Sequence, residues 1–432
     1  MAYELVDAVQ LNNDLLDIAD AIRDRSGGQD PLHFPNEFIS EVNSLIPTVN
    51  GSTNFTVKAI EALSKGDTVW AFGSLDKLPN PDFQTGCTDL SVNKSGTRAA
   101  VSITTSPYIA VYDLTTMPYT QLDVITSLPP NIGNGVSWSP DGTRLAIAHN
   151  SSPYITIYDT TTTPYTKLAN PSTLPTGAAT KCAWSPDGTR LAVGHSTSPF
   201  VTIYDTTTTP YTKLANPSTL PPAQGRGCAW SPDGTRLAIG TNSSPFIMIY
   251  DATTTPYTKL ADPDTLPPGQ GLRCAWSPNG ERLSLSSNTS PYLYVYDTTT
   301  TPYTKLQGSL SIPAATSNGN EWSPDGSVFV VCSNSSPYIS LFDATTPFPY
   351  TPITGPDNNP GGQANFIQWN PSGTILYVAC ATVKGPLSYA YGGSMAYKAS
   401  NKTNNTMSGK YCIATQAIAS GSTGTVLALF EP

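Results

Sequence analysis

Residues 181–221 read KCAWSPDGTRLAVGHSTSPFVTIYDTTTTPYTKLANPSTLP, and this stretch decides the fold because the chain repeats it. Short runs rich in β-branched and aromatic residues alternate with turn residues, so we expect four strands in each copy. In the turn Ser-Pro-Asp-Gly, proline presets one φ angle and glycine accepts a positive one, which reverses the chain between the first two strands. One copy therefore predicts one four-stranded antiparallel unit.

The repeat has a period of 46 residues, with one step of 47, as the turn glycines show: Gly96, Gly142, Gly188, Gly234, Gly280, Gly326 and Gly373. A Pro followed by Tyr or Phe, an Asp that closes the third strand and a Trp that closes the first strand recur with the same period. Four-stranded units at this spacing are typical of propeller blades. The sequence thus predicts a mainly β fold, a seven-bladed β-propeller over residues 73–394.

The seventh repeat lacks a clear outer strand. Residues 73–82, GSLDKLPNPD, precede the first inner strand and are similar to the repeat segment YTKLANPST. We expect these residues to complete the seventh blade, because a clasp of this kind covers the strand edges that an open ring would expose.

The repeats resemble the WD40-like propeller families, and most closely the SPDG-bearing repeats of TolB-like proteins, over about residues 73–394. A Tyr-Asp pair, as in Tyr204-Asp205, stands where WD40 repeats have Trp-Asp, and their Gly-His element is absent. The WD40 hydrogen-bonded tetrad is therefore not carried over to this chain. The resemblance implies the fold, and a propeller fold does not name a function.

Composition limits the classes of partner. Only 12% of the 432 residues are charged, but 38% are hydrophobic, which is enough for a folded core. The net charge of -9, without a Lys/Arg cluster, argues against nucleic acid or an anionic membrane as partner. We find no signal peptide and no apolar window of membrane-spanning length, so we expect assembly in a cytoplasm. The seven cysteines form no CxxC pair, which favours reduced, packed thiols.

The first 53 residues differ from the repeats. Leu11, Leu15, Ile18 and Ile22 follow one another at steps of 4, 3 and 4, which places them on one face of a helix. A second short helix that carries Phe38 and Ile39 can cover this face within the chain, or the helices of other subunits can cover it. We expect residues 1–53 to form a helical attachment and assembly module, with these six side chains as assembly residues and a homo-oligomer as the result.

Both flanks of the propeller resemble parts of bacteriophage proteins. Residues 15–45, LLDIADAIRDRSGGQDPLHFPNEFISEVNSL, look like the amino-terminal module of many phage tail and minor structural proteins. Residues 56–72 and 408–430 look like the two ends of a small β-domain found in phage fibre and head-decoration proteins. Residues 54–72 and 395–432 would then form one discontinuous β-domain that carries the propeller as an insertion.

Residues with catalytic or metal-binding chemistry are few or periodic. The histidines are His33, His149 and His195, and none stands in a zinc or protease motif. The acids and arginines near the turns recur with the repeat, which indicates blade architecture. We see no acids that break the repeat, as a paired-carboxylate hydrolase would require, and no DxDxDG calcium loop. The aromatic residue after each repeated Pro is expected to pack between blades, with a saccharide-stacking ring as the alternative.

These observations together predict a non-enzymatic structural protein of a bacteriophage particle that needs no cofactor. A tail fibre or appendage that displays the propeller for host-surface interaction or as decoration is favoured over a head-decoration protein. Its expected partners are other virion proteins and a host-surface glycan or protein. The alternative from another class is a cytoplasmic propeller scaffold for protein–protein interaction. A glycan depolymerase is a third class, which lacks candidate carboxylates.

Overall fold

A computed structural model describes the repeat region and five short strands outside it. The described residues are 54–59, 68–72, 78, 85–115, 119–308, 310, 312, 315–353, 360–382, 387–391, 394–398, 410–414 and 423–430. The helical module expected at residues 1–53, with its six assembly residues, lies outside them. The described residues contain strands and turns but no helix, so they include no helix that could span a membrane.

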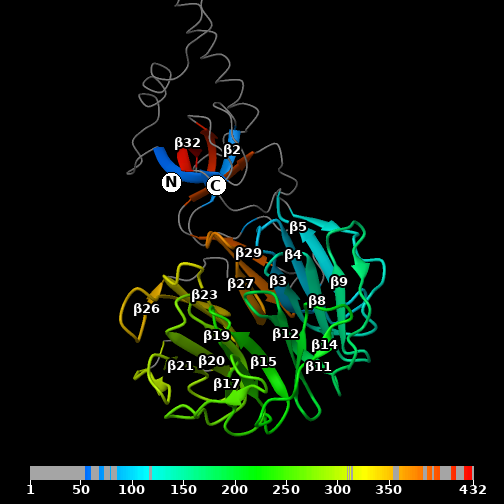
Figure 1. The fold of residues 1–432 in the computed structure, drawn as a ribbon. Coiled ribbons are helices and arrows are strands. Elements are labelled where there is room, and N and C mark those ends of the chain that lie inside the picture. The colour runs from blue at the N-terminus through cyan, green and yellow to red at the C-terminus, as the bar shows by residue number, and fades with distance from the viewer. Residues whose placement is uncertain are drawn as a thin grey trace, which may run out of the picture. The chain divides into compact units, whose positions relative to one another are not determined.

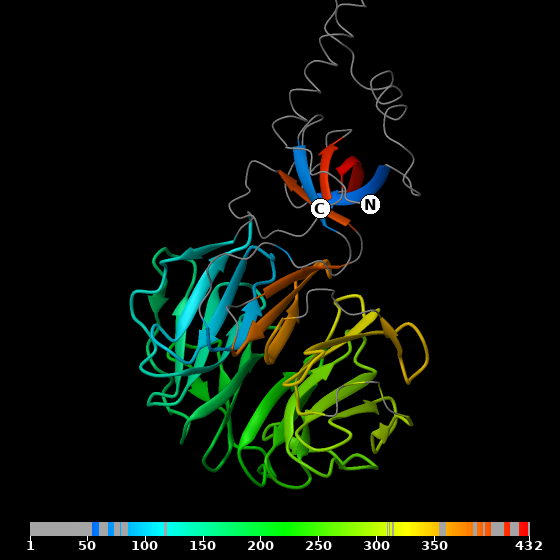
Figure 2. The same cartoon turned by 180° about the vertical axis from the view of Figure 1, so that it is seen from behind.

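The repeat region folds as seven antiparallel sheets, which are the blades of a propeller (Figures 1 and 2). The first strands are β3 (Cys87–Val92), β7 (Gly133–Trp138), β11 (Ala179–Trp184), β15 (Gly225–Trp230), β19 (Gly271–Trp276), β23 (Ser317–Trp322) and β27 (Ala364–Trp369). The second strands are β4 (Arg98–Ile103), β8 (Arg144–His149), β12 (Arg190–His195), β16 (Arg236–Thr241), β20 (Arg282–Ser287), β24 (Val328–Ser333) and β28 (Ile375–Cys380).

The outer half of each blade is shorter. The third strands are β5 (Ile109–Asp113), β9 (Ile155–Asp159), β13 (Val201–Asp205), β17 (Ile247–Asp251), β21 (Leu293–Asp297), β25 (Ile339–Asp343) and β29 (Leu387–Ala390). The fourth strands are β6 (Thr120–Leu122), β10 (Thr166–Lys167), β14 (Thr212–Lys213), β18 (Thr258–Lys259), β22 (Thr304–Lys305) and β26 (Thr351–Ile353). The predicted seven-bladed propeller is confirmed, with four described strands in six blades and three in the seventh.

The turn predicted from the sequence between the first two strands is present in the second and third blades. In the third blade Gly188 has a φ of 72°, which a side chain would disfavour. Asp187 accepts a hydrogen bond from the Thr189 amide at 3.1 Å and another from the Ser185 hydroxyl. In the second blade Asp141 accepts the same two bonds, so the periodic acids serve the turns, as expected.

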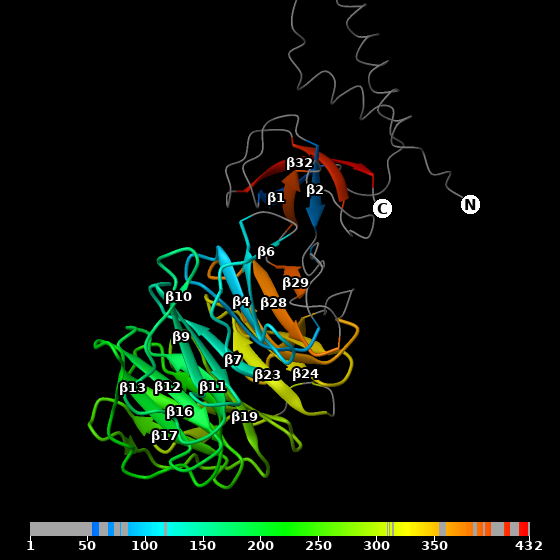
Figure 3. The same cartoon turned by 90° about the vertical axis from the view of Figure 1, so that its right-hand side faces the viewer.

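The ring closes between the seventh blade and the first, and Figure 3 shows β28 beside β4. The Asn365 side chain donates to the Cys87 carbonyl at 2.8 Å, and the Val92 amide donates to Gln368 Oε1 at 2.8 Å. The buried Leu78 donates its amide to the Ser388 carbonyl of β29 at 2.8 Å. Leu78 is the one described residue of the expected clasp at 73–82, and it lies beside the third strand of the seventh blade, where the clasp was predicted.

The hydrophobic core lies between blades rather than within them. Seven clusters of buried side chains are found among the described residues, and each joins two neighbouring blades. One of them packs Ile155 and Ile157 of the second blade against Trp184 and Tyr204 of the third. Another packs Tyr377 of the seventh blade against Tyr119 of the first, with 6.0 Å between the ring centroids. Each blade therefore buries both of its faces, which explains why so few positions carry a charge.

The periodic tryptophans link each blade to the one before it. In the second to fifth blades the indole Nε1 atom donates to a backbone carbonyl on the preceding first strand, as Trp184 does to Ser137 at 3.2 Å and Trp230 does to Ala183 at 3.1 Å. Trp184 also packs edge-on against Tyr211, with 6.0 Å between the ring centroids. In the sixth and seventh blades, the buried Nε1 atoms of Trp322 and Trp369 have no hydrogen-bond partner within the described part of the chain.

Five further strands come from the two sides of the propeller in the sequence, namely β1 (Asn54–Ala59), β2 (Thr68–Phe72), β30 (Ser394–Lys398), β31 (Lys410–Ala414) and β32 (Thr423–Phe430). Their backbones pair in the order β1-β30-β2-β31-β32 as a closed barrel (Figure 3). Phe55 is opposite Val426, and Val69 is opposite Cys412. That these strands form one domain that folds independently stays a prediction.

The paired tryptophans allow a matched test of the inter-blade hydrogen bond. Trp184→Phe removes aromatic surface and the bond to Ser137, whereas Trp322→Phe removes similar surface without losing a bond to the described residues. We expect Trp184→Phe to lower the free energy of unfolding by about 1 kcal/mol more than Trp322→Phe. Denaturant unfolding of the two variants measures the difference, and equal losses would show that the indole bond adds nothing.

Candidate functional site

The two histidines of the repeat are structural. His149 and His195 are buried at the ends of β8 and β12, and each bonds through Nε2 to a threonine of its own blade, Thr156 or Thr202, at 2.9 Å. Burial lowers the pKa of both side chains to about 4, so both are neutral at pH 7. Neither contacts a second group with catalytic or metal-binding chemistry, and within the described ranges no group of His, Cys, Asp or Glu could hold a metal ion.

The cysteines and the strand-start aromatics also have packing roles. Cys182 and Cys228 are buried in two of the inter-blade clusters, and burial raises the pKa of each thiol to about 12, which keeps it protonated. Tyr154 and Tyr338 are half-buried and pack against inter-blade clusters. These observations agree with the packing role expected from the sequence.

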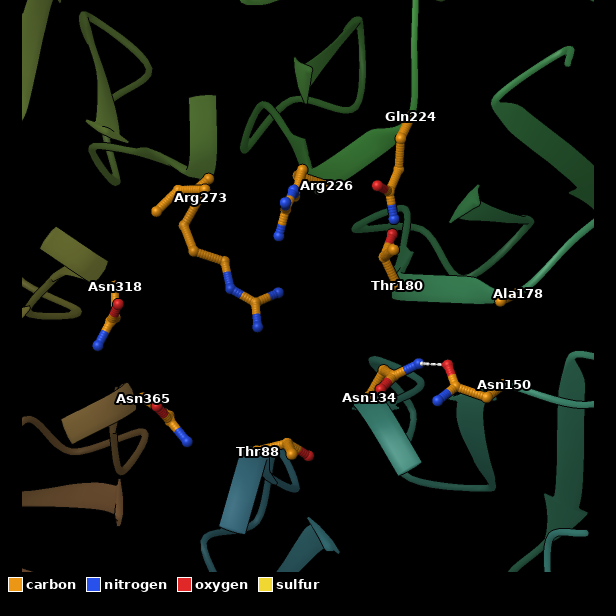
Figure 4. Close-up of a pocket in the computed structure, with 11 residues that line it drawn as sticks. Thr88, Asn134, Asn150, Ala178, Thr180, Gln224, Arg226, Arg273, Asn318 and Asn365 are labelled. Carbon is orange, nitrogen blue, oxygen red and sulfur yellow. Dashed lines mark hydrogen bonds between the residues drawn. The ribbon is translucent and has the colours of Figure 1, made fainter. Parts of the chain in front are cut away.

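A cavity of about 370 Å³ lies on the propeller axis, where all seven first strands begin. The structurally equivalent position at this end of the strands carries Thr88, Asn134, Thr180, Arg226, Leu272, Asn318 and Asn365. Asn150, Ala178, Gln224 and Arg273 complete the wall. Figure 4 shows these side chains arranged around the space that the strands enclose. All of these wall residues except Ala178 and Leu272 are polar, and two arginines supply the charge of the wall.

Several of the polar wall residues are fixed by bonds to the next blade. The side-chain amides of Asn134, Asn318 and Asn365 donate to the carbonyls of Ala179, Ala364 and Cys87 at 2.7, 2.9 and 2.8 Å. Asn134 also donates to Asn150 Oδ1 at 2.6 Å (Figure 4). Because the amide nitrogens are used in this way, the Oδ1 atoms of Asn134 and Asn318 are left as acceptors beside the cavity.

Both guanidinium groups point into the cavity (Figure 4). Arg226 is held by neutral acceptors, with Nε donating to Asn242 Oδ1 at 2.6 Å and one terminal nitrogen to Gln270 Oε1 at 3.4 Å. Burial, and next the charge of Arg273, lowers the pKa of Arg226. Arg273 forms neither a hydrogen bond nor an ion pair through its guanidinium with the described residues, and its group lies 5.4 Å from the ring centroid of Phe366.

A second group of charges lies along the axis below this ring of side chains. Lys181 forms an ion pair with the fully buried Asp89, whose Oδ2 atom also accepts the Val136 amide at 2.9 Å. The Lys181 ammonium sits 4.0 Å from the centroid of Phe366. Burial lowers the pKa of Lys181, and the Asp89 carboxylate partly opposes this effect. The charges of Lys181 and Asp89 therefore neutralise each other within the propeller.

Glu321 lies on the same axis, in the wall of a second cavity of about 270 Å³ that also contains Lys181, Arg273 and Phe366. Burial raises the pKa of this carboxyl group to about 8, so most of it is protonated at pH 7. Two acids, Asp89 and Glu321, thus break the repeat and face the axis. The sequence-based expectation that no acid breaks the repeat is wrong, because it considered the periodic turn acids and not the inner strands.

The sequence does contain the signal for these residues. Alignment of the repeats on their turn glycines places Asp89, Gly135, Lys181, Gly227, Arg273, Gly319 and Phe366 at one position. Two steps further along the strand, Glu321 stands where the first five blades have Ser or Ala and the seventh has Gln368. Because the first strands line the axis, charges at these positions must meet one another there.

The comparisons with known proteins show the fold. Neither a protein-family profile nor a curated protein sequence matches the chain. Among solved structures, the chain is similar to the β-propeller domain of Cps50 (Swd1) from Myceliophteria thermophila, with a TM-score of 0.56 and 13% identity. The likeness covers 74% of this chain and 99% of that domain. It confirms the β-propeller fold, and at this identity the likeness says nothing about the function of the chain.

The Asp89–Lys181 pair predicts non-additive effects on stability. Lys181→Met leaves the Asp89 carboxylate buried without its counter-charge, which we expect to cost about 3 kcal/mol of unfolding free energy. Asp89→Asn together with Lys181→Met removes both charges and keeps an acceptor for Val136, so the double variant should recover more than half of that loss. Denaturant unfolding measures both values, and simple additivity would contradict the proposed coupling.

The buried histidines predict a loss of stability in mild acid. Above pH 6.5 they are neutral in both states and contribute nothing. As the pH falls from 6.5 to about 4, the two histidines bind protons in the unfolded chain but stay neutral in the folded blades. The free energy of unfolding therefore falls. His149→Thr with His195→Thr copies Thr241, the buried residue at the equivalent position of the fourth blade.

At pH 5 we expect each wild-type histidine to account for a loss on the order of 1 kcal/mol. The double variant should therefore lose less stability than the wild type between pH 7 and pH 5. Melting temperatures across this range provide the test, and parallel curves for the two proteins would contradict it.

Proposed function

We propose that the chain is a non-enzymatic structural protein of a bacteriophage particle, a tail-fibre or appendage component. Its terminal modules attach it to other virion proteins, and its propeller is displayed for host-surface interaction or as decoration. A head-decoration protein is the close alternative. Residues 15–45, together with the two segments 56–72 and 408–430, supply the resemblance that supports a phage origin.

The observation that carries this proposal is the pairing of strands from the two sides of the propeller. β2 pairs with β30 and with β31, and β1 pairs with β32, so strands from residues 54–72 and 394–430 belong to one closed barrel. A propeller whose chain enters and leaves through one small β-unit agrees with the proposed insertion in that unit. Such an arrangement would suit a propeller that is attached to the particle through the β-unit.

The chemistry of the described residues supports a binding role over a catalytic one. The turn acids are occupied in turns, the repeat histidines are neutral and buried, and Asp89 is paired with Lys181. A glycosidase needs two carboxyl groups facing one bond with room for substrate between them. Glu321 alone among the axial acids lines a cavity, which does not meet that requirement.

The attachment role can be tested in the particle. The full chain is expressed during infection, particles are purified, and the protein is located by immuno-gold labelling. We expect the wild type to copurify with particles and to form an oligomer. Leu15→Asp with Ile18→Asp places charges on the predicted apolar helix face, so this double variant should be lost from particles while the propeller retains its thermal transition.

Asn12→Asp with Asn13→Asp is the matched control, because it adds the same two charges away from the Leu11, Leu15, Ile18 and Ile22 face. This control should be incorporated normally. Normal incorporation of the Leu15/Ile18 variant would refute the attachment role of the helix. If the wild type is absent from particles, the virion proposal fails and the cytoplasmic scaffold is favoured.

A further inference from the structure

The axial cavity has more positive charge than the described residues neutralise. Three cations approach the axis here, Lys181, Arg226 and Arg273, and only Lys181 has a carboxylate partner. Glu321 carries little charge at pH 7 because burial holds its pKa at about 8. The two arginines thus form an unneutralised pair in a chain whose net charge is -9.

The geometry of the arginines is suited to a bound anion. Neutral oxygens of Asn242 and Gln270 orient the Arg226 guanidinium without neutralising it. Arg273 stands at the next first strand, and its charge already acts on Arg226. Two like charges held side by side facing a cavity repel one another, and an anion between them converts that repulsion into attraction. A guanidinium donates two parallel bonds, which matches a carboxylate.

The remaining wall is suited to hydroxyl groups. Asn134 and Asn318 present acceptor oxygens, since their nitrogens donate to backbone carbonyls. Gln224 uses its oxygen to accept from Asn242 at 2.8 Å, which leaves its amide nitrogen as a donor. A volume of about 370 Å³ lies at the small end of ligand sites, so it suits one sugar ring rather than an extended chain.

We propose that this cavity binds an acidic monosaccharide, with Arg226 and Arg273 holding its carboxylate and the side chains of Asn134, Asn318 and Gln224 contacting its hydroxyl groups. The inference stands on the cavity itself and does not require the chain to be a virion component. If both proposals hold, the propeller recognises host glycans through terminal sugar acids.

The test is isothermal titration calorimetry of the purified full chain with D-glucuronate, D-galacturonate and N-acetylneuraminate. We expect a dissociation constant of about 1 mM or tighter for at least one of them. D-Glucose, which lacks the carboxylate, and acetate, which lacks the hydroxyls, should each bind at least tenfold more weakly. Failure of all three acids to bind, or equal binding of glucose, would overturn the proposal. Tighter binding of inorganic phosphate would overturn it too, since the cavity would then select a bare anion.

Two variants locate the binding. Arg226→Thr copies Thr88 and Thr180, which hold the same position in other blades, and Arg273→Met keeps the length of the side chain without its charge. Each should lower the affinity at least tenfold. Arg144→Met is the matched control, since Arg144 pairs with Asp159 at 3.1 Å outside the cavity wall. Equal loss in the control would overturn the assignment, and unchanged melting curves for the three variants show that the propeller remains folded.

Discussion

Each blade depends on its neighbours because both of its faces are apolar. Ile155 and Ile157 of one blade need Trp184 and Tyr204 of the next, and the same relation continues around the ring until Tyr377 packs against Tyr119. No blade can bury its core alone, so closure between β27–β29 and β3–β6 is the condition on which the other contacts depend. The Asn365 and Gln368 bonds and the amide of Leu78 lie at that junction.

Closure also determines what the axis can hold. Seven first strands converge there, and Gly135 and Gly227 let neighbouring strands approach closely. A Cβ atom on Gly227 would lie 2.8 Å from the Leu272 carbonyl oxygen, so the backbones of adjacent blades are already close. The larger side chains at this position are Asp89, Lys181, Arg273 and Phe366, which come from the first, third, fifth and seventh blades. Most positions of the blades repeat around the ring. The axial residues that do not repeat supply the charged groups on the axis.

The sequence predicts the periodic part of the molecule well. Blade number, strand order, turn geometry and the packing of Cys182 follow from a repeat in which local patterns agree with one another. The axial site was missed because its members are single substitutions in strands that are far apart in the chain. Their proximity follows from ring closure, which no local window contains. The six apolar residues of the first 53 lie outside the described structure, so their role rests on helical spacing alone.

The Asp89–Lys181 pair has a consequence for how the blades are held together. Each hydrophobic cluster joins two neighbouring blades, so the clusters couple the ring only from one blade to the next. Asp89 and Lys181 join the first blade to the third across the axis, and Phe366 of the seventh blade lies against the same lysine. An opening of the ring that separated these blades would leave a buried charge without its partner. The non-repeating axial residues therefore couple blades that are not neighbours in the ring.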